Sequence, residues 1–108
     1  MKPVDFIAEL HYRTAEEGGR NTPAFSGYRP TIKFFFSDMQ TSGQQVFINK
    51  DKVYPGESVR AEITIVSDAY FKYQLSEGMD FEFREGPNII GHGTILKIVN
   101  TELQKTGI

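Results

Sequence analysis

The sequence predicts an all-β domain, a small antiparallel barrel or sandwich built from six short strands. Short segments alternate apolar and polar residues, clusters of turn residues separate them, and no helical period persists over an ordinary helix length. Nine phenylalanines among 108 residues add a preference for strands. A chain of this length can bury one core and shows no internal repeat, so we expect residues 1–108 to form a single domain.

The first part of the chain predicts a strand, a long loop and a second strand. Residues 4–13 alternate between an apolar face that includes Phe6 and Leu10 and a more polar face, as a half-buried strand requires. Residues 14–30 contain several glycines and prolines and predict a long loop, which is usually functional or packed upon itself. Residues 31–36 form the second predicted strand. Its run of three phenylalanines indicates burial on both faces or a bend at a barrel corner.

The middle of the chain combines turns with one clearly alternating strand. We expect a turn at residues 38–43 and a short strand at residues 44–48. The dipeptide Pro55-Gly56 suits the central positions of a type II turn, and residues 59–65 follow it with regular alternation. The next segment has no clean period, so we expect it to be irregular and to cover the core with three side chains: Phe71, Tyr73 and Leu75.

The last part of the chain predicts a hairpin and a tail. Residues 79–84 alternate, turn residues follow, and residues 89–99 return, which is typical of a hairpin. Gly91 and Gly93 lie in the return strand, where a closing sheet bends sharply or another backbone approaches. Because residues 100–108 are polar and unpatterned, we expect an ordered core over residues 4–99 and a frayed tail over residues 100–108.

Charge and composition restrict the partners. The formal net charge is −2 and the isoelectric point about 5.6, whereas proteins that bind nucleic acid by bulk electrostatics carry a basic excess. We therefore expect no DNA partner and, at most, a local RNA contact. Four arginines could supply one if the fold gathers them, although composition favours separate solvated side chains: Arg13, Arg20, Arg29 and Arg84. Without cysteines or a long apolar stretch, we expect a soluble cytoplasmic protein with no membrane partner.

No motif for catalysis or cofactor binding is present. Residues 86–93 come nearest to a phosphate-binding loop, but they lack its lysine and hydroxyl and lie between two predicted strands. His11 and His92 are far apart in sequence and have no cysteine to complete a metal site, so two partly exposed histidines are the simpler interpretation. Ser26 lacks the leading glycine of a nucleophile elbow. We expect no enzyme activity, no cofactor and no metal.

Three segments resemble the C-terminal domain of elongation factor Tu. The first is residues 16–30, EEGGRNTPAFSGYRP, which is similar to that family's loop E-G-G-R-x-T-P-x-x-x-G-Y-R-P. The second is residues 54–59, YPGESV, which resembles the turn and strand M-P-G-D-x-V. The third is residues 78–93, similar to the hairpin G-x-R-F-A-I-R-E-G-G-x-T-V-G-x-G. The resemblance runs from residue 6 to residue 98.

This resemblance implies a six-stranded antiparallel barrel of Greek-key type. In the family, the barrel packs beside a second barrel and a GTPase domain and contacts the nucleotide-exchange factor and the T-stem of aminoacyl-tRNA. We expect such a barrel to gather eight side chains in one core: Phe6, Leu10, Phe34, Ile63, Ile65, Phe81, Phe83 and Ile98.

The resemblance also implies RNA-binding residues. Arg20 matches the family's tRNA-contacting arginine, and Glu85 with Gly86 matches the contacting pair of its hairpin. Thr31 stands where the family's loop ends in glutamine, and we include it among the expected RNA-binding residues. Pro87 departs from the usual glycine and removes an amide.

The matching residues have a second explanation, because Arg20 and Arg84 can also make structural hydrogen bonds that build the loops. Two or three charge-assisted contacts of about 1.5–3 kcal/mol each barely offset an association cost of roughly 4–15 kcal/mol. We therefore expect a non-catalytic binding module that docks on a translation factor or GTPase domain, or weakly on an aminoacyl-tRNA stem. The alternative is a repurposed protein-interaction barrel with no role in tRNA binding.

Overall fold

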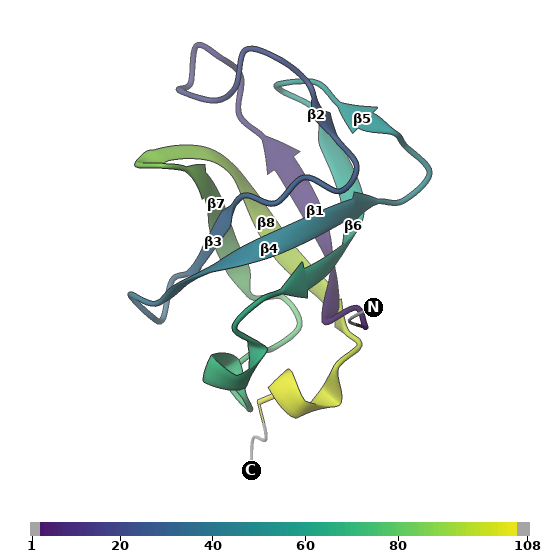
Figure 1. Ribbon diagram of the computed structural model, residues 1–108, viewed down its shortest axis with the longest axis vertical. Helices are drawn as coiled ribbons and strands as arrows, with labels where there is room; N and C mark the ends of the chain where they lie inside the picture. The colour runs from purple at the N-terminus through teal and green to yellow at the C-terminus, as the bar shows by residue number, and fades with distance from the viewer. Residues whose placement is uncertain (1–2, 106–108) are drawn as a thin grey trace.

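The computed structural model describes residues 3–105, which form a closed barrel (Figure 1). Its strands follow the order β1-β6-β4-β3-β7-β8, and β8 pairs back with β1. The barrel strands are β1 (Phe6–Tyr12), β3 (Thr31–Phe34), β4 (Gln40–Phe47), β6 (Ser58–Ile65), β7 (Asp80–Glu85) and β8 (Asn88–Ile98). Every neighbouring pair is antiparallel. The predicted six-stranded antiparallel barrel is confirmed.

The strand connections follow a Greek-key path. β1 pairs with β6 and β8, although β3 is the next barrel strand along the chain. The long connection between β1 and β3 crosses one end of the barrel, at the top of Figure 1. There it carries β2 (Ala24–Phe25), which pairs with β5 (Lys52–Val53) in a separate small sheet. This end of the barrel also carries the candidate site.

The barrel interior is filled largely by aromatic rings. All eight predicted core side chains are buried, with at most 6% of each residue exposed. The ring of Phe81 meets those of Phe6 and Phe34 edge-on, with centroids 5.7 Å apart in both pairs. A Cβ at Gly93 would lie 2.3 Å from the Phe81 ring, and one at Gly91 would lie 2.6 Å from the carbonyl oxygen of His11. The backbone approach expected at these glycines is therefore found at Gly91, whereas the close neighbour of Gly93 is the side-chain ring of Phe81.

β4 begins earlier than predicted. The expected turn at residues 38–43 is wrong for most of its length, because β4 already starts at Gln40. The buried positions of this strand are Thr41, Gly43, Gln45 and Phe47, so only the last is a large apolar residue and the alternation signal is weak. Gln45 accepts a hydrogen bond from the Tyr12 hydroxyl inside the barrel, while its Nε2 has no partner among the described residues.

Two short 3₁₀ helices cover the opposite end of the barrel, η1 (Asp68–Phe71) and η2 (Thr101–Leu103) (Figure 1). Phe71 and Leu75 are buried as predicted, but the prediction for Tyr73 is wrong: this residue is 52% exposed and has a φ of 60°. Residues 100–105 differ from the expected frayed tail, because Leu103 is buried and the Lys105 amide donates to the Leu75 carbonyl at 2.7 Å. Residues 106–108 of that prediction lie outside the described residues.

The predicted Pro-Gly turn before β6 is present. The amide of Glu57 donates to the carbonyl of Tyr54 at 3.0 Å, and Gly56 has a φ of 90°. Within residues 3–105, no helix combines the length and the apolar character needed to cross a bilayer.

Candidate functional site

The four predicted RNA-binding residues lie together at the end of the barrel covered by the long loop. Thr31 opens β3 and pairs with Arg84 of β7. Glu85 ends β7, and Gly86 follows in the turn before β8, with a φ of 57°. Arg20 reaches this hairpin from the long loop, where its Nη1 donates to the carboxylate of Glu85. The fold thus joins loop and hairpin, which are 65 positions apart in the sequence at this contact.

Arg20 directs all its donor groups into the protein. Its Nε donates to the carbonyl of Thr22 at 3.3 Å, and its Nη2 donates to the Thr22 hydroxyl at 3.2 Å and the Pro23 carbonyl at 3.3 Å. The guanidinium lies 4.9 Å from the ring centroid of Tyr28, whose hydroxyl donates to the same Glu85 carboxylate. Only 20% of the Arg20 side chain is exposed. Arg20 therefore clamps the long loop onto the β7–β8 hairpin.

The charges of this clamp balance one another. Burial acts to lower the pKa of Arg20, but hydrogen bonds to Glu85 and Tyr28 and the nearby carboxylate charge outweigh it, so the pKa is raised. Burial raises the pKa of Tyr28, and the hydrogen bond to Glu85 raises it further. At neutral pH the cluster thus holds one guanidinium, one carboxylate and one neutral phenol. Its central cation is already paired before any ligand arrives.

Hydrogen bonds at the beginning of the long loop position Arg20 against the β7–β8 hairpin. The Thr14 amide donates to the Glu17 carboxylate at 2.9 Å, and the Glu17 amide donates to the Thr14 hydroxyl at 3.2 Å. The hydrogen bond from the Thr14 backbone is the main cause that lowers the pKa of Glu17. A Cβ at Gly19 would lie 2.3 Å from the carbonyl oxygen of Arg13, so this fold of the loop requires glycine there. The glycine before Arg20 is a structural requirement of the loop.

Arg29 differs from the other arginines that the sequence singled out. Three of these have a polar side-chain partner: Arg13 with His92 and Arg20 with Glu85 on other segments, and Arg84 with Glu82 on its own strand β7. Arg29 is exposed and has no hydrogen bond or ion pair with the residues that the structure describes. Three of the four arginines therefore have internal partners, which differs from the four separate solvated side chains that composition favours. The sequence pattern could not show that Arg29 differs from the other three arginines, because the partners of an arginine depend on which residues the fold brings near it.

The two histidines are neighbours across a strand pair, which their sequence separation concealed. His11 of β1 lies opposite His92 of β8. The Nδ1 of His11 is 3.0 Å from the Ser58 hydroxyl, and the Nε2 of His92 is 3.4 Å from the Arg13 guanidinium. No group of three or more metal-ligating side chains gathers within residues 3–105. This pair is part of a polar outer surface on the barrel.

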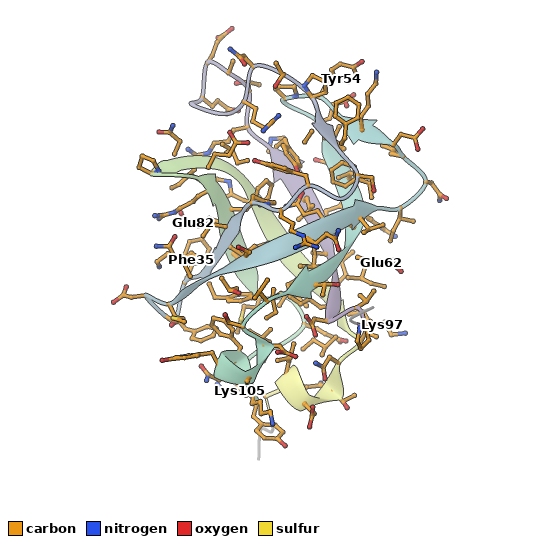
Figure 2. All side chains as sticks on the ribbon, viewed as in Figure 1. Phe35, Tyr54, Glu62, Glu82, Lys97 and Lys105 are labelled. Carbon is orange, nitrogen blue, oxygen red and sulfur yellow. The ribbon has the colours of Figure 1, made fainter. Side chains whose placement is uncertain are left out.

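A groove of about 410 Å³ crosses that outer surface over β1, β8 and β7. Its lining residues are Glu9, His11, Phe35, Asp80, Phe81, His92, Gly93 and Thr94. Phe35 and Phe36 follow the end of β3 in a turn and are 57% and 46% exposed, so burial on both faces, one of the two expectations for the phenylalanine run, is wrong. Figure 2 labels Phe35 and Glu82 on the side of the barrel formed by β3 and β7.

Comparison with protein families gives one match for the site and the fold together. A family model described as the elongation factor Tu C-terminal domain matches residues 2–99. Because β8 ends at Ile98, the match contains all six barrel strands, the long loop with Arg20 and the β7–β8 hairpin with Glu85.

Proposed function

The chain belongs to the elongation factor Tu C-terminal domain family, and from this premise we propose that it is a non-catalytic barrel that docks on a translation-related protein. The preferred partner class is a GTPase domain or another translation factor. Such a partner implies that the protein acts in the cytoplasm.

The observation that carries this choice is that the guanidinium of Arg20 is already fully engaged inside the protein. The arginine expected to meet an RNA phosphate donates instead to Glu85, Thr22 and Pro23. A phosphate would have to displace a carboxylate that is already in place. Together with a net charge of −2, this favours a protein partner over a nucleic acid.

Titration calorimetry with a defined partner tests the proposal. The chain is titrated into an elongation factor Tu fragment that contains the GTPase domain and the second barrel but lacks the C-terminal domain. We expect saturable binding of one chain per fragment, with a Kd of about 1–100 μM, typical of a modest interface. The complete factor is the matched control and should not bind, because its own domain occupies the position. Absence of binding to the fragment would contradict the proposal.

A second candidate function is weak contact with an aminoacyl-tRNA stem. It is favoured by the exposed Arg29, which lies two residues before Thr31, the first residue of β3. One or two phosphate contacts would give binding that prefers RNA stems over DNA through backbone shape and 2′-hydroxyls.

Fluorescence anisotropy with aminoacyl-tRNA at two salt concentrations separates the two functions. The RNA function predicts that Arg29→Ala removes about one unit of the logarithmic salt slope, while the paired Arg20 contributes less. Protein docking predicts no detectable tRNA binding at near-physiological salt. If the chain binds neither tRNA nor the fragment, the repurposed interaction barrel is the remaining account.

A further inference from the structure

The outer groove has the composition of a site for a cationic side chain. It contains two carboxylates, Glu9 and Asp80, and no lysine or arginine among its lining residues. Asp80 accepts a hydrogen bond from the Thr94 hydroxyl at 2.6 Å, and no cation pairs with it among residues 3–105. Glu9 is 3.6 Å from Arg60, but both side chains are about half or more exposed, so this pair is weak and easily displaced.

Glu82, a neighbouring acidic residue on β7, differs from Asp80 because a cation already pairs with it. Glu82 is 6% exposed and accepts from Arg84 at 2.6 Å, so its charge is already paired. His92 of the groove has its Nε2 3.4 Å from the Arg13 guanidinium, which belongs to a residue outside the groove lining. The uncompensated charge of the groove is therefore concentrated at Asp80, with Glu9 as a second, weakly paired carboxylate.

Phe35 adds an aromatic face on which a cation can stack beside the carboxylates. This residue is 57% exposed and lines the same groove as Asp80. A guanidinium can stack on an aromatic face while its N–H groups reach a carboxylate, a combination that an ammonium group matches less well. Arginine and aromatic residues are both enriched in protein interfaces. A groove of about 410 Å³ has room for one such side chain.

We propose that this groove binds an arginine side chain of the docking partner, stacked on Phe35 and paired with Asp80. The inference rests on the proposed docking function, for which it names the recognition chemistry. The site lies on the outer face of β1, β8 and β7, and it is separate from the Arg20 clamp, whose residues do not line the groove.

NMR titration of the full chain with the peptide acetyl-Gly-Arg-Gly-amide tests the proposal. We expect saturable shifts at the groove residues, with a Kd on the order of 1–10 mM for this minimal ligand. The same peptide with citrulline in place of arginine keeps the shape, lacks the charge, and should not bind. Phe35→Leu and Asp80→Asn should each weaken arginine-peptide binding about fivefold.

The chain offers matched control variants on another surface. Phe25 is 61% exposed and Asp51 is exposed, and both lie at the small β2–β5 sheet. Phe25→Leu and Asp51→Asn should therefore bind the arginine peptide like the wild type. Equal binding of the citrulline peptide, absence of saturable shifts, or unchanged affinity in both groove variants would overturn the proposal.

The same variants separate this inference from the docking function itself. If the elongation factor fragment binds wild type and both groove variants equally, docking stands and the arginine site is wrong. If the arginine peptide binds in the groove while the fragment does not bind at all, the site stands and the proposed docking function is wrong.

Discussion

At the residue scale, Arg20 shows that a residue in a binding motif can have a structural role in the fold. Its sequence context matches a nucleic-acid contact, yet its guanidinium connects the long loop to Glu85 and lies against Tyr28. A side chain with this many internal hydrogen bonds contributes to stability whatever else it contacts. Its contribution can be measured without any ligand.

We predict that Arg20→Ala lowers the free energy of unfolding by about 1–3 kcal/mol, because it removes charge-assisted hydrogen bonds and leaves Glu85 unpaired. Urea denaturation of Arg20→Ala, Glu85→Gln and the double variant should show a coupling energy of about 0.5–3 kcal/mol. Arg29→Ala is the control and should change stability by less than about 0.5 kcal/mol. Additive effects in the double variant would show that the clamp does not hold the loop.

Phe81 is the residue on which the core prediction depends most. Its ring is fully buried between Phe6 and Phe34 and lies over Gly93. Phe81→Ala should lower the free energy of unfolding by about 3–5 kcal/mol, enough to unfold a marginal domain. Phe25→Ala, at a 61% exposed position, should cost less than about 1 kcal/mol. Equal melting temperatures for the two variants would contradict the assigned core.

At the element scale, the contribution of the start of the long loop to stability depends on pH, because Glu17 titrates there. The lowered pKa of Glu17 arises mainly from the hydrogen bond donated by the Thr14 backbone. A lowered folded-state pKa stabilises the protein above the unfolded value of about 4.5 and loses this effect as pH falls through the folded value. The stabilisation is therefore present at neutral pH and disappears in acid.

We predict that wild type is more stable than Glu17→Gln at pH 6 and that this difference shrinks as the pH falls below 4.5. Urea denaturation of both proteins between about pH 6 and pH 3 measures the difference directly. Parallel stability curves over this range would mean that the Thr14–Glu17 pair does not hold the loop.

The sequence predicted elements well where local alternation carries the signal. β1, β6 and β7 have apolar residues at every second position, so both their existence and their buried faces could be read from the sequence. β4 was partly missed because its buried positions include Gly43 and Gln45. The two-residue strands β2 and β5 are too short for any period to appear. β2 lies within the long loop, and its pairing with β5 depends on the path of that loop, which local sequence patterns do not predict.

The sequence singled out Arg20 and Glu85 as candidate site residues without relating one to the other. The glycine and hairpin motifs did not show that these two residues pair with each other, as they do in the structure. The neighbouring histidines and the groove depend on the register between β1, β8 and β7. Register between strands distant in sequence is a tertiary property, so it became visible only in the structure.

At the scale of the whole molecule, the barrel separates three surfaces. The long loop and hairpin form one end and the 3₁₀ helices cover the other (Figure 1). The groove lies over β1, β8 and β7 on the side of the barrel. The first surface is held by an internal ion pair, and the third contains Asp80, which has no cationic partner among residues 3–105, beside the exposed Phe35. This distribution supports docking through the side of the barrel.

Sedimentation velocity of an equimolar mixture of this chain, aminoacyl-tRNA and the elongation factor Tu fragment without its C-terminal domain tests docking most directly. In the absence of the fragment, our account predicts that chain and tRNA sediment independently at near-physiological salt. With the fragment present, it predicts that the chain co-sediments with the fragment. A chain that co-sediments with tRNA alone, or that stays separate from the fragment in every mixture, would contradict the account.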